Sequence, residues 1–239
     1  MLEKTEGIVL NSIKYGDSSK IIQVFTKNFG KLSFIAKGAY NTKSKFGASL
    51  EPTTYANFTF YNKPNKDLYL LSNSELIQSF SNLSKFQENL IYAMMILECV
   101  YLTQEPKVKN ERLFNHLLSS LINITQKSIS PFNIFCYFMY LLSSDMGFAI
   151  TLKNDLLPDS DYYIDFQDGS IKLWDNLTLK NIYKLNYNEL KSLSSIILEN
   201  DFNKKYNKNF IDRIYNFWIQ YFSFHLERKF FLKTYTVLC

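Results

Sequence analysis

Residues 30–47 read GKLSFIAKGAYNTKSKFG, and this stretch decides the fold of the N-terminal part of the chain. Leu32, Phe34 and Ala36 occupy every second position, so they share one face of a predicted strand. Residues 37–47 then bring three lysines, two aromatic residues and two glycines, a composition typical of an exposed loop. The stretch therefore predicts a strand that ends in a basic loop.

Short apolar runs of the same kind lie on both sides of this stretch. They occupy residues 7–10, 21–25, 55–61 and 68–72, and turn signals separate them at residues 15–17, 28–30 and 62–65. About five short strands with little helix predict a small Greek-key barrel, of which the OB-fold is the common example. Composition alone leaves an SH3-like barrel open as the alternative.

The apolar pattern changes from strand to helix at Ser84. Helices are predicted near residues 90–101, 113–124, 131–147, 187–200 and 207–227. Residues 162–174 interrupt them and read as a hairpin around Asp168-Gly169, within an insertion at about 148–180. We therefore predict an α+β multidomain chain, with an OB-fold β-barrel domain at residues 1–80 and a mostly α-helical domain at residues 81–239 that carries the small β-hairpin insertion.

The positive charge of the chain is concentrated in its first 50 residues. The whole chain has a formal net charge of +5. Residues 1–50 contain eight lysines against three acidic residues, whereas the remaining 19 basic and 19 acidic residues cancel. A local basic excess of this kind favours an anionic partner such as nucleic acid.

The lysine-rich loop supplies the candidate binding residues. Lys37, Lys43 and Lys45 can follow the phosphates of a bound strand. Tyr40 and Phe46 can each offer a stacking face to an unpaired base, which contributes about 1–3 kcal/mol per base. The alternative is that the lysines only solvate an exposed loop and that Phe46 fills the barrel, and for Phe46 we favour burial.

No pattern of catalytic residues is present in the sequence. It lacks the phosphate-binding G-x-x-x-x-G-K-[ST], the nucleophile turn G-x-S-x-G and the dinucleotide-binding G-x-G-x-x-G. A group of aspartates raises the alternative of a nuclease-type magnesium site, but because the EF-hand and nuclease spacings are absent we favour an exposed loop and hairpin. These are Asp155, Asp159, Asp161, Asp165 and Asp168. We therefore predict no enzyme activity, no catalytic residue, no metal and no cofactor.

Cysteine and histidine are too sparse to form a zinc site. Cys99, Cys136 and Cys239 are far apart, and the chain contains no C-x-x-C or H-x-x-x-H pair. No apolar run reaches the roughly 20 residues that cross a bilayer, and residues 1–6 do not read as a secretory signal. We therefore expect reduced cysteines, a cytoplasmic location and no membrane partner.

Five stretches carry a family resemblance through their order and spacing. They are residues 4–10 (KTEGIVL), 15–21 (YGDSSKI), 29–32 (FGKL), 36–39 (AKGA) and 43–52 (KSKFGASLEP). Together they resemble the N-terminal domain of the RecO family of DNA repair proteins. The resemblance continues weakly through residues 71–76 and the helical region, and it returns at residues 224–229 (FHLERK).

The resemblance implies a nucleoid-associated mediator of recombination in a RecF-type pathway, without enzymatic turnover. Family members bind single- and double-stranded DNA, anneal complementary strands, contact the C-terminal tail of single-stranded DNA-binding protein (SSB), and act with RecR to load RecA. The carry-over to DNA contact is best for Lys37, Lys43 and Lys45, and it is weaker for Lys14, Lys20 and Lys31.

This sequence departs from the family pattern at one place. Many members carry zinc-binding cysteines in the insertion, and these are missing after Gly147. We expect the pairing of the hairpin and the packing of Trp174 to replace the metal. Two alternatives to the mediator remain: a generic OB-fold protein that binds single strands or RNA and oligomerises through its helical domain, and a metal-dependent nuclease that uses Asp165 and Asp168.

Overall fold

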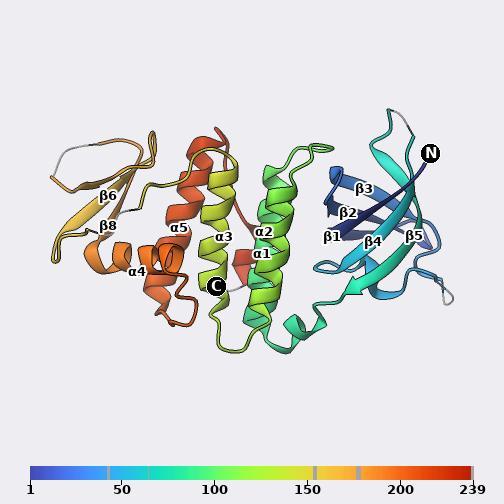
Figure 1. Cartoon of the computed structure of the whole chain (residues 1–239), viewed down its shortest axis with the longest axis horizontal. Coiled ribbons are helices and arrows are strands. Elements are labelled where there is room, and N and C mark those ends of the chain that lie inside the picture. The colour runs from blue at the N-terminus through green and yellow to red at the C-terminus, as the bar shows by residue number, and fades with distance from the viewer. Residues whose placement is uncertain (42–43, 64, 153–154, 176–178, 238–239) are drawn as a thin grey trace. The chain divides into compact units, whose positions relative to one another are not determined.

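The computed structural model describes residues 1–41, 44–63, 65–152, 155–175 and 179–237 of the 239-residue chain (Figure 1). It contains two compact units. Residues 1–125 and 234–239 make up the first unit, and residues 126–233 make up the second. In the described ranges, no helix combines the length and the apolar character that crossing a bilayer requires.

The first unit contains a closed five-stranded barrel. Its strands are β1 (Leu2–Tyr15), β2 (Ser19–Thr26), β3 (Gly30–Ala36), β4 (Tyr55–Tyr61) and β5 (Leu68–Gln78). They are hydrogen-bonded in the order β1-β2-β3-β5-β4, and β4 closes the barrel on β1. The β3–β5 pair is parallel and the other pairs are antiparallel. The predicted OB-like barrel is therefore confirmed.

The predicted strand in the deciding stretch is β3, and its alternation builds the barrel core. Leu32, Phe34 and Ala36 are all buried. The ring of Phe34 stacks on Phe58 of β4, with 5.8 Å between the ring centroids, and lies 5.0 Å from Phe60. Burying one such side chain stabilises the fold by about 1.5–3 kcal/mol, so these aromatic pairs account for much of the barrel's cohesion.

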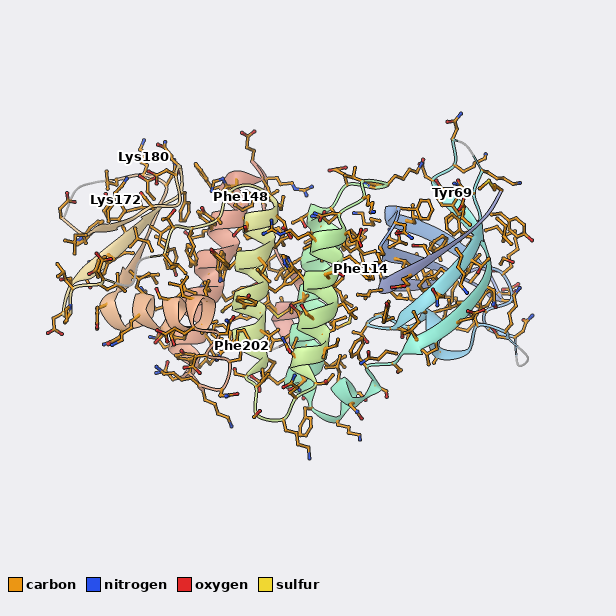
Figure 2. All side chains as sticks on the ribbon, viewed as in Figure 1. Tyr69, Phe114, Phe148, Lys172, Lys180 and Phe202 are labelled. Carbon is orange, nitrogen blue, oxygen red and sulfur yellow. The ribbon has the colours of Figure 1, made fainter. Side chains whose placement is uncertain are left out.

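Two helices belong to the same unit as the barrel. They are α1 (Gln87–Thr103) and α2 (Glu111–Ile124), preceded by short 3₁₀ turns at Gly47–Leu50 and Ser81–Lys85. Phe114 of α2 packs against Phe25 of β2 and Tyr55 of β4, with centroid distances of 6.3 and 6.1 Å (Figure 2). Helix α2 begins at a capped end, because the side chain of Asn110 accepts a hydrogen bond from the Leu113 backbone N–H.

The chain returns to the first unit near its C-terminus. Thr234, in the 3₁₀ segment Lys233–Val237, donates hydrogen bonds from its backbone N–H and its hydroxyl to the Glu98 carboxylate of α1, at 3.0 and 2.7 Å. The second unit is therefore inserted, in chain order, between two parts of the first.

The second unit combines three helices with a small sheet. The helices are α3 (Pro131–Asp145), α4 (Tyr187–Leu198) and α5 (Lys208–His225), and the sheet has the order β7-β6-β8, with β6 (Asp161–Asp165), β7 (Ile171–Leu173) and β8 (Ile182–Asn186). The predicted hairpin is β6–β7, turned at Asp168-Gly169. The third strand, β8, was not predicted, because it is five residues long and runs directly into α4.

The hairpin is held by side chains of its own unit. Trp174 lies edge-on to Tyr163, with 6.1 Å between centroids, and the Lys184 ammonium lies 4.8 Å from the Trp174 ring. Lys172 pairs with Asp165 and Asp168. Among the described residues, no group of three or more His, Cys, Asp or Glu is placed to hold a metal ion.

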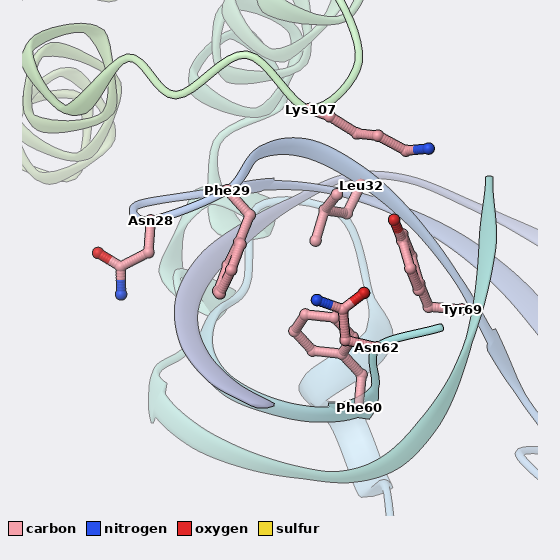
Figure 3. Close-up of a pocket in the computed structure, with 7 residues that line it drawn as sticks. All are labelled: Asn28, Phe29, Leu32, Phe60, Asn62, Tyr69 and Lys107. Atoms are coloured by element: carbon pink, nitrogen blue, oxygen red, sulfur yellow. The ribbon is translucent and has the colours of Figure 1, made fainter. Parts of the chain in front are cut away.

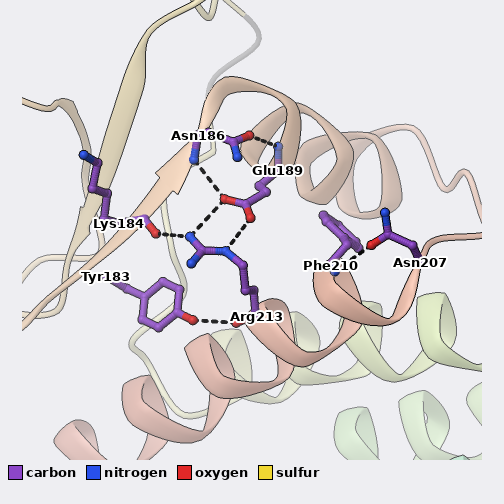
Figure 4. Close-up of polar contacts among 7 residues, drawn as sticks. All are labelled: Tyr183, Lys184, Asn186, Glu189, Asn207, Phe210 and Arg213. Carbon is purple, nitrogen blue, oxygen red and sulfur yellow. Dashed lines mark hydrogen bonds and ion pairs between the residues drawn. The ribbon is translucent and has the colours of Figure 1, made fainter.

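A polar network joins β8, α4 and α5 (Figure 4). Glu189 and Asn186 form a capping box at the start of α4, in which each side chain bonds the backbone N–H of the other at 2.9 Å. The same Glu189 carboxylate, which is buried, accepts a two-pronged contact from Arg213 of α5. Arg213 also donates to the Lys184 carbonyl at 2.9 Å and accepts from Tyr183 through its own carbonyl at 2.8 Å.

Candidate nucleic-acid interface

A tyrosine that two neighbouring lysines approach lies at one end of the barrel. Lys14 of β1 is in register with Lys20 of β2. Their ammonium groups lie 5.8 and 5.1 Å from the ring centroid of Tyr40, whose side chain is 49% exposed. The backbone N–H of Tyr40 donates to the Ser18 carbonyl at 3.0 Å, which ties the segment after β3 to the β1–β2 turn. The structure thus gathers three predicted residues into one tyrosine–lysine cluster.

The lysines of this cluster differ in how available they are. The Lys20 side chain is only 11% exposed, and its ammonium binds the Glu51 carboxylate at 2.5 Å. Lys14 is exposed. Lys14 therefore offers its charge directly to a ligand, whereas Lys20 acts mainly beneath the Tyr40 ring.

The predicted basic loop is present only in part in the described structure. Lys37 is exposed in the turn that follows β3. Lys45 is exposed as well, with its ammonium 5.4 Å from the Phe46 ring. Lys43 lies outside the described residues.

Two of the candidate DNA-binding residues have structural positions. Phe46 is 4% exposed and belongs to the barrel core, which confirms the burial favoured from the sequence and closes its ring to a base. Lys31 is half-buried and donates to the Tyr101 carbonyl of α1 at 2.6 Å, with its ammonium 5.0 Å from the Tyr101 ring. Lys31 therefore ties β3 to α1 and lies apart from the cluster.

A row of apolar side chains crosses the outside of the barrel beside the cluster. Ile13, Ile21, Ile35 and Leu70 are cross-strand partners on β1, β2, β3 and β5 in turn. Ile13 and Leu70 are exposed, and Ile21 and Ile35 are half-buried. Exposed apolar surface of this kind marks binding faces, and strands 2 and 3 form the ligand face of OB-folds. The sequence could not reveal this row, because it depends on the register of four strands.

A small pocket opens at the other end of the barrel (Figure 3). Its volume is about 170 Å³, and its lining residues are Asn28, Phe29, Leu32, Phe60, Asn62, Tyr69 and Lys107. The residues come from the β2–β3 turn, three strands or strand ends, and the segment between α1 and α2. The sequence signalled two of these segments only as turns, at 28–30 and 62–65, so the pocket was not predicted.

Lys107 is fixed at the rim of this pocket. Its backbone N–H donates to the Lys31 carbonyl at 3.1 Å, and its ammonium binds Asp67 at 2.7 Å. The hydrogen bond from Lys107 lowers the pKa of the Asp67 carboxyl, and the same bond raises the pKa of Lys107. Lys107 therefore remains charged at neutral pH.

Three aspartates of the insertion form ion pairs with nearby lysines. Asp165 and Asp168 bind Lys172 at 3.0 and 3.6 Å, and Asp161 binds Lys184 at 2.8 Å. Carboxylates neutralised by lysines in this way do not supply the paired free oxygens that a magnesium site needs.

Comparisons with known proteins cover most of the chain. Residues 1–80 match the family model described as Recombination protein O N terminal, and residues 87–233 match Recombination protein O C terminal. A DNA repair protein RecO from Salinibacter ruber is 35% identical over 148 residues, which are 61% of this chain and 56% of that protein. The protein of the same name from Alkaliphilus metalliredigens is 39% identical over 127 residues, 53% and 50% of the two chains.

A third relative aligns from end to end. The DNA repair protein RecO of Acetivibrio thermocellus is 29% identical over 248 aligned residues, which cover 97% of this chain and 96% of that protein. The alignments with the first two relatives span only about half of their length.

Proposed function

Because the chain belongs to the RecO family of DNA repair proteins, we propose that it is a non-enzymatic recombination mediator that binds DNA through its N-terminal barrel. The observation that carries the DNA-binding part is the tyrosine–lysine cluster, where the ammonium groups of Lys14 and Lys20 lie near an exposed Tyr40 ring. An aromatic face beside positive charge is the arrangement that single-strand-binding OB-folds use.

In this proposal the phosphates and the bases use different parts of the surface. Lys14, Lys37 and Lys45 contact phosphates, together with Lys43 of the same loop. Tyr40 stacks on an unpaired base. The adjacent bases place their apolar faces against the row of side chains from Ile13 to Leu70. Duplex DNA uses the lysines alone, because its bases stay stacked in the helix.

The proposed partners follow from the family. We propose that the chain binds single- and double-stranded DNA, anneals complementary strands, binds the C-terminal tail of SSB, and acts with RecR to load RecA in the bacterial cytoplasm. The generic alternative, an OB-fold protein for single strands or RNA, shares the DNA contacts and lacks the SSB and RecR contacts.

The first test measures binding of labelled single-stranded DNA by fluorescence anisotropy across a salt series. The triple variant Lys14→Ala, Lys37→Ala, Lys45→Ala should bind more weakly and lower the slope of log K against log salt by about 0.7 per lost phosphate contact. Tyr40→Ala should weaken binding with little change in slope. The matched control is Lys85→Ala, Lys127→Ala, Lys205→Ala, three exposed lysines elsewhere in the chain.

A second measurement distinguishes the recombination mediator from the generic OB-fold protein. A peptide with the acidic SSB tail sequence is titrated against the protein with and without DNA. Binding of both DNA and peptide supports the mediator, and DNA binding alone supports the generic OB-fold protein. If the triple variant kept the wild-type slope of log K against log salt, the tyrosine–lysine cluster would be excluded as the DNA-binding site.

A further inference from the structure

We infer that the pocket at the end of the barrel opposite the tyrosine–lysine cluster binds one unstacked nucleobase of a single strand. The inference rests on the proposed function, because it assigns a base site to the strand that the barrel binds. It adds a second contact, on residues that the sequence did not single out: Phe29, Asn28, Asn62 and Lys107.

The walls of the pocket are aromatic. Phe29 meets Phe60 edge-to-face at 5.6 Å, and Phe60 meets Tyr69 in the same way at 5.4 Å. Phe60 and Tyr69 are buried and form the floor, while Phe29 is half-exposed at the mouth. The volume of about 170 Å³ is close to the roughly 150 Å³ of a cavity that holds benzene, so a single six-membered ring fits.

The rim of the pocket is polar, which selects a base over an aliphatic side chain. The Asn62 amide lies beside the Phe60 ring, while Asn28 lines the edge of the pocket next to Phe29 with its amide directed away from the rings (Figure 3). The Asn62 amide offers one acceptor and two donors, which complement the N–H donor and the two carbonyl acceptors that a thymine presents along its pairing edge. An aliphatic side chain would fill the space between the aromatic walls and leave this amide without a partner from the ligand.

The charge around the mouth matches a phosphate backbone. Lys107 is held at the rim, and Lys63 and Lys66 are exposed in the β4–β5 connection next to Asn62. Asp67 offsets one of these three charges through its bond to Lys107. The excess of positive charge beside an aromatic slot favours a nucleotide over an uncharged ligand.

The position of the pocket fits the length of a bound strand. The cluster follows the last residue of β3, and the pocket contains Phe29 and Leu32 near its first residue. Seven residues of strand rise by about 3.3 Å each, so the two contacts are roughly 20 Å apart along β3. A strand that uses both contacts therefore runs along the face that carries Ile21 and Ile35.

The test compares an oligothymidylate of twelve nucleotides with a twelve-mer of the same charge whose central positions are abasic. Asn28→Ala with Asn62→Ala should weaken oligothymidylate binding about tenfold and leave the abasic strand unchanged, because only base contacts are removed. The control pair, Asn57→Ala with Asn203→Ala, lies away from the pocket and should change neither. Thermal melting checks that each variant folds.

The possible outcomes distinguish a failure of the base site from a failure of the proposed function. If the pocket variant binds both strands like wild type, with salt dependence intact, the base site is refuted and DNA binding stands. If wild type binds neither strand, the proposed function fails. If the variant instead loses binding of an acidic peptide ending in phenylalanine and retains oligothymidylate binding, the pocket takes a protein side chain and the inference is overturned.

Discussion

His225 lies in an aromatic cage at the end of α5. Its ring stacks on Phe148 at 4.3 Å and 6°, and Tyr221 lies edge-on at 4.6 Å. Burial lowers the pKa of His225 below its ordinary value of 6.5, although a backbone hydrogen bond to Phe166 acts the other way. The folded state therefore holds this imidazole in its neutral form.

This cage predicts a loss of stability in mild acid. As the pH falls below about 6.5, the unfolded chain takes up the proton first, so the free energy of unfolding falls until the pH reaches the lower pKa of the folded state. Thermal melting between pH 7.5 and pH 5 should show this decline, and His225→Gln should flatten it. An equal slope in both proteins would show that other groups cause it.

At the scale of single residues, the sequence favoured burial for Phe46 and exposure for the loop that carries Tyr40, but it did not indicate which contacts separate the two rings. Tyr40 and Phe46 are both aromatic residues in the same basic segment, yet one is exposed and the other fills the barrel. Their difference arises from the closure of the 3₁₀ turn Gly47–Leu50 against the barrel, a tertiary event without a local signal. The contact of Lys31 with Tyr101 was not foreseen for the same reason, because the two residues are 70 positions apart in the sequence.

At the scale of elements, Gly30 lets the α1–α2 connection pass close to the barrel. Its φ is +67°, and a Cβ added there would come within 2.1 Å of the Val108 carbonyl oxygen. The residue before Val108 is Lys107, so this approach positions the charged rim of the pocket.

Two glycine variants measure how much this close approach affects the free energy of unfolding. Gly16 has a similar φ of +59°, with nothing within 4 Å of its added Cβ. Gly16→Ala should therefore cost only the strain of a left-handed residue, about 1–2 kcal/mol, while Gly30→Ala should cost more because the connection must also shift. Urea unfolding of the two variants measures the difference, and equal losses would contradict the close approach.

The Glu189–Arg213 pair makes a second prediction at this scale. Removing Arg213 leaves a buried carboxylate that still caps α4. Arg213→Ala should lower the free energy of unfolding by about 2 kcal/mol, less than the 3–5 kcal/mol typical of fully buried pairs, because the arginine is partly exposed. Lys4→Ala, which breaks the exposed pair with Glu75, should cost less than about 1 kcal/mol. Comparable losses in denaturant melts of the two variants would contradict this ranking.

Elements with a strong local sequence pattern were predictable, whereas features that depend on pairing between distant segments were not. The alternation of β3 and the Asp168-Gly169 turn both have sequence signals that survive in the structure. The strand β8, the outer row and the pocket all depend on pairings between distant segments. That the insertion lacks the zinc-binding cysteines of many family members is a property of the sequence itself, and the expectation that it binds no zinc stays a prediction.

At the scale of the whole molecule, the chain leaves the first unit and comes back to it. The return is fixed by the two hydrogen bonds from Thr234 to the Glu98 carboxylate. Thr234→Val keeps the shape and the backbone bond and removes the hydroxyl bond. It should lower stability by about 1–3 kcal/mol, since a hydrogen bond to a charged group is lost.

Hydrogen exchange measures the effect of Thr234→Val in the helix that Thr234 contacts. Amides of α1 around Glu98 should exchange faster in Thr234→Val, while amides of the β6–β7 hairpin should keep their wild-type rates. Thr59→Val, at a half-buried position of β4 in the same unit, serves as the matched control. Faster exchange in the hairpin alone would contradict the assignment of Thr234 to the first unit.

The double passage of the chain between its two units also has a mechanical consequence. The polypeptide crosses between them near residue 125 and again near residue 233, so the units share two covalent tethers. A domain on a single tether can swivel in every direction, whereas a second tether restricts it to rotations that move neither crossing far. A protease cut near residue 233 would therefore leave the two units covalently joined near residue 125, whereas after a cut near residue 125 only non-covalent contacts, such as the packing of the segment around Thr234 on α1, would hold the fragments together.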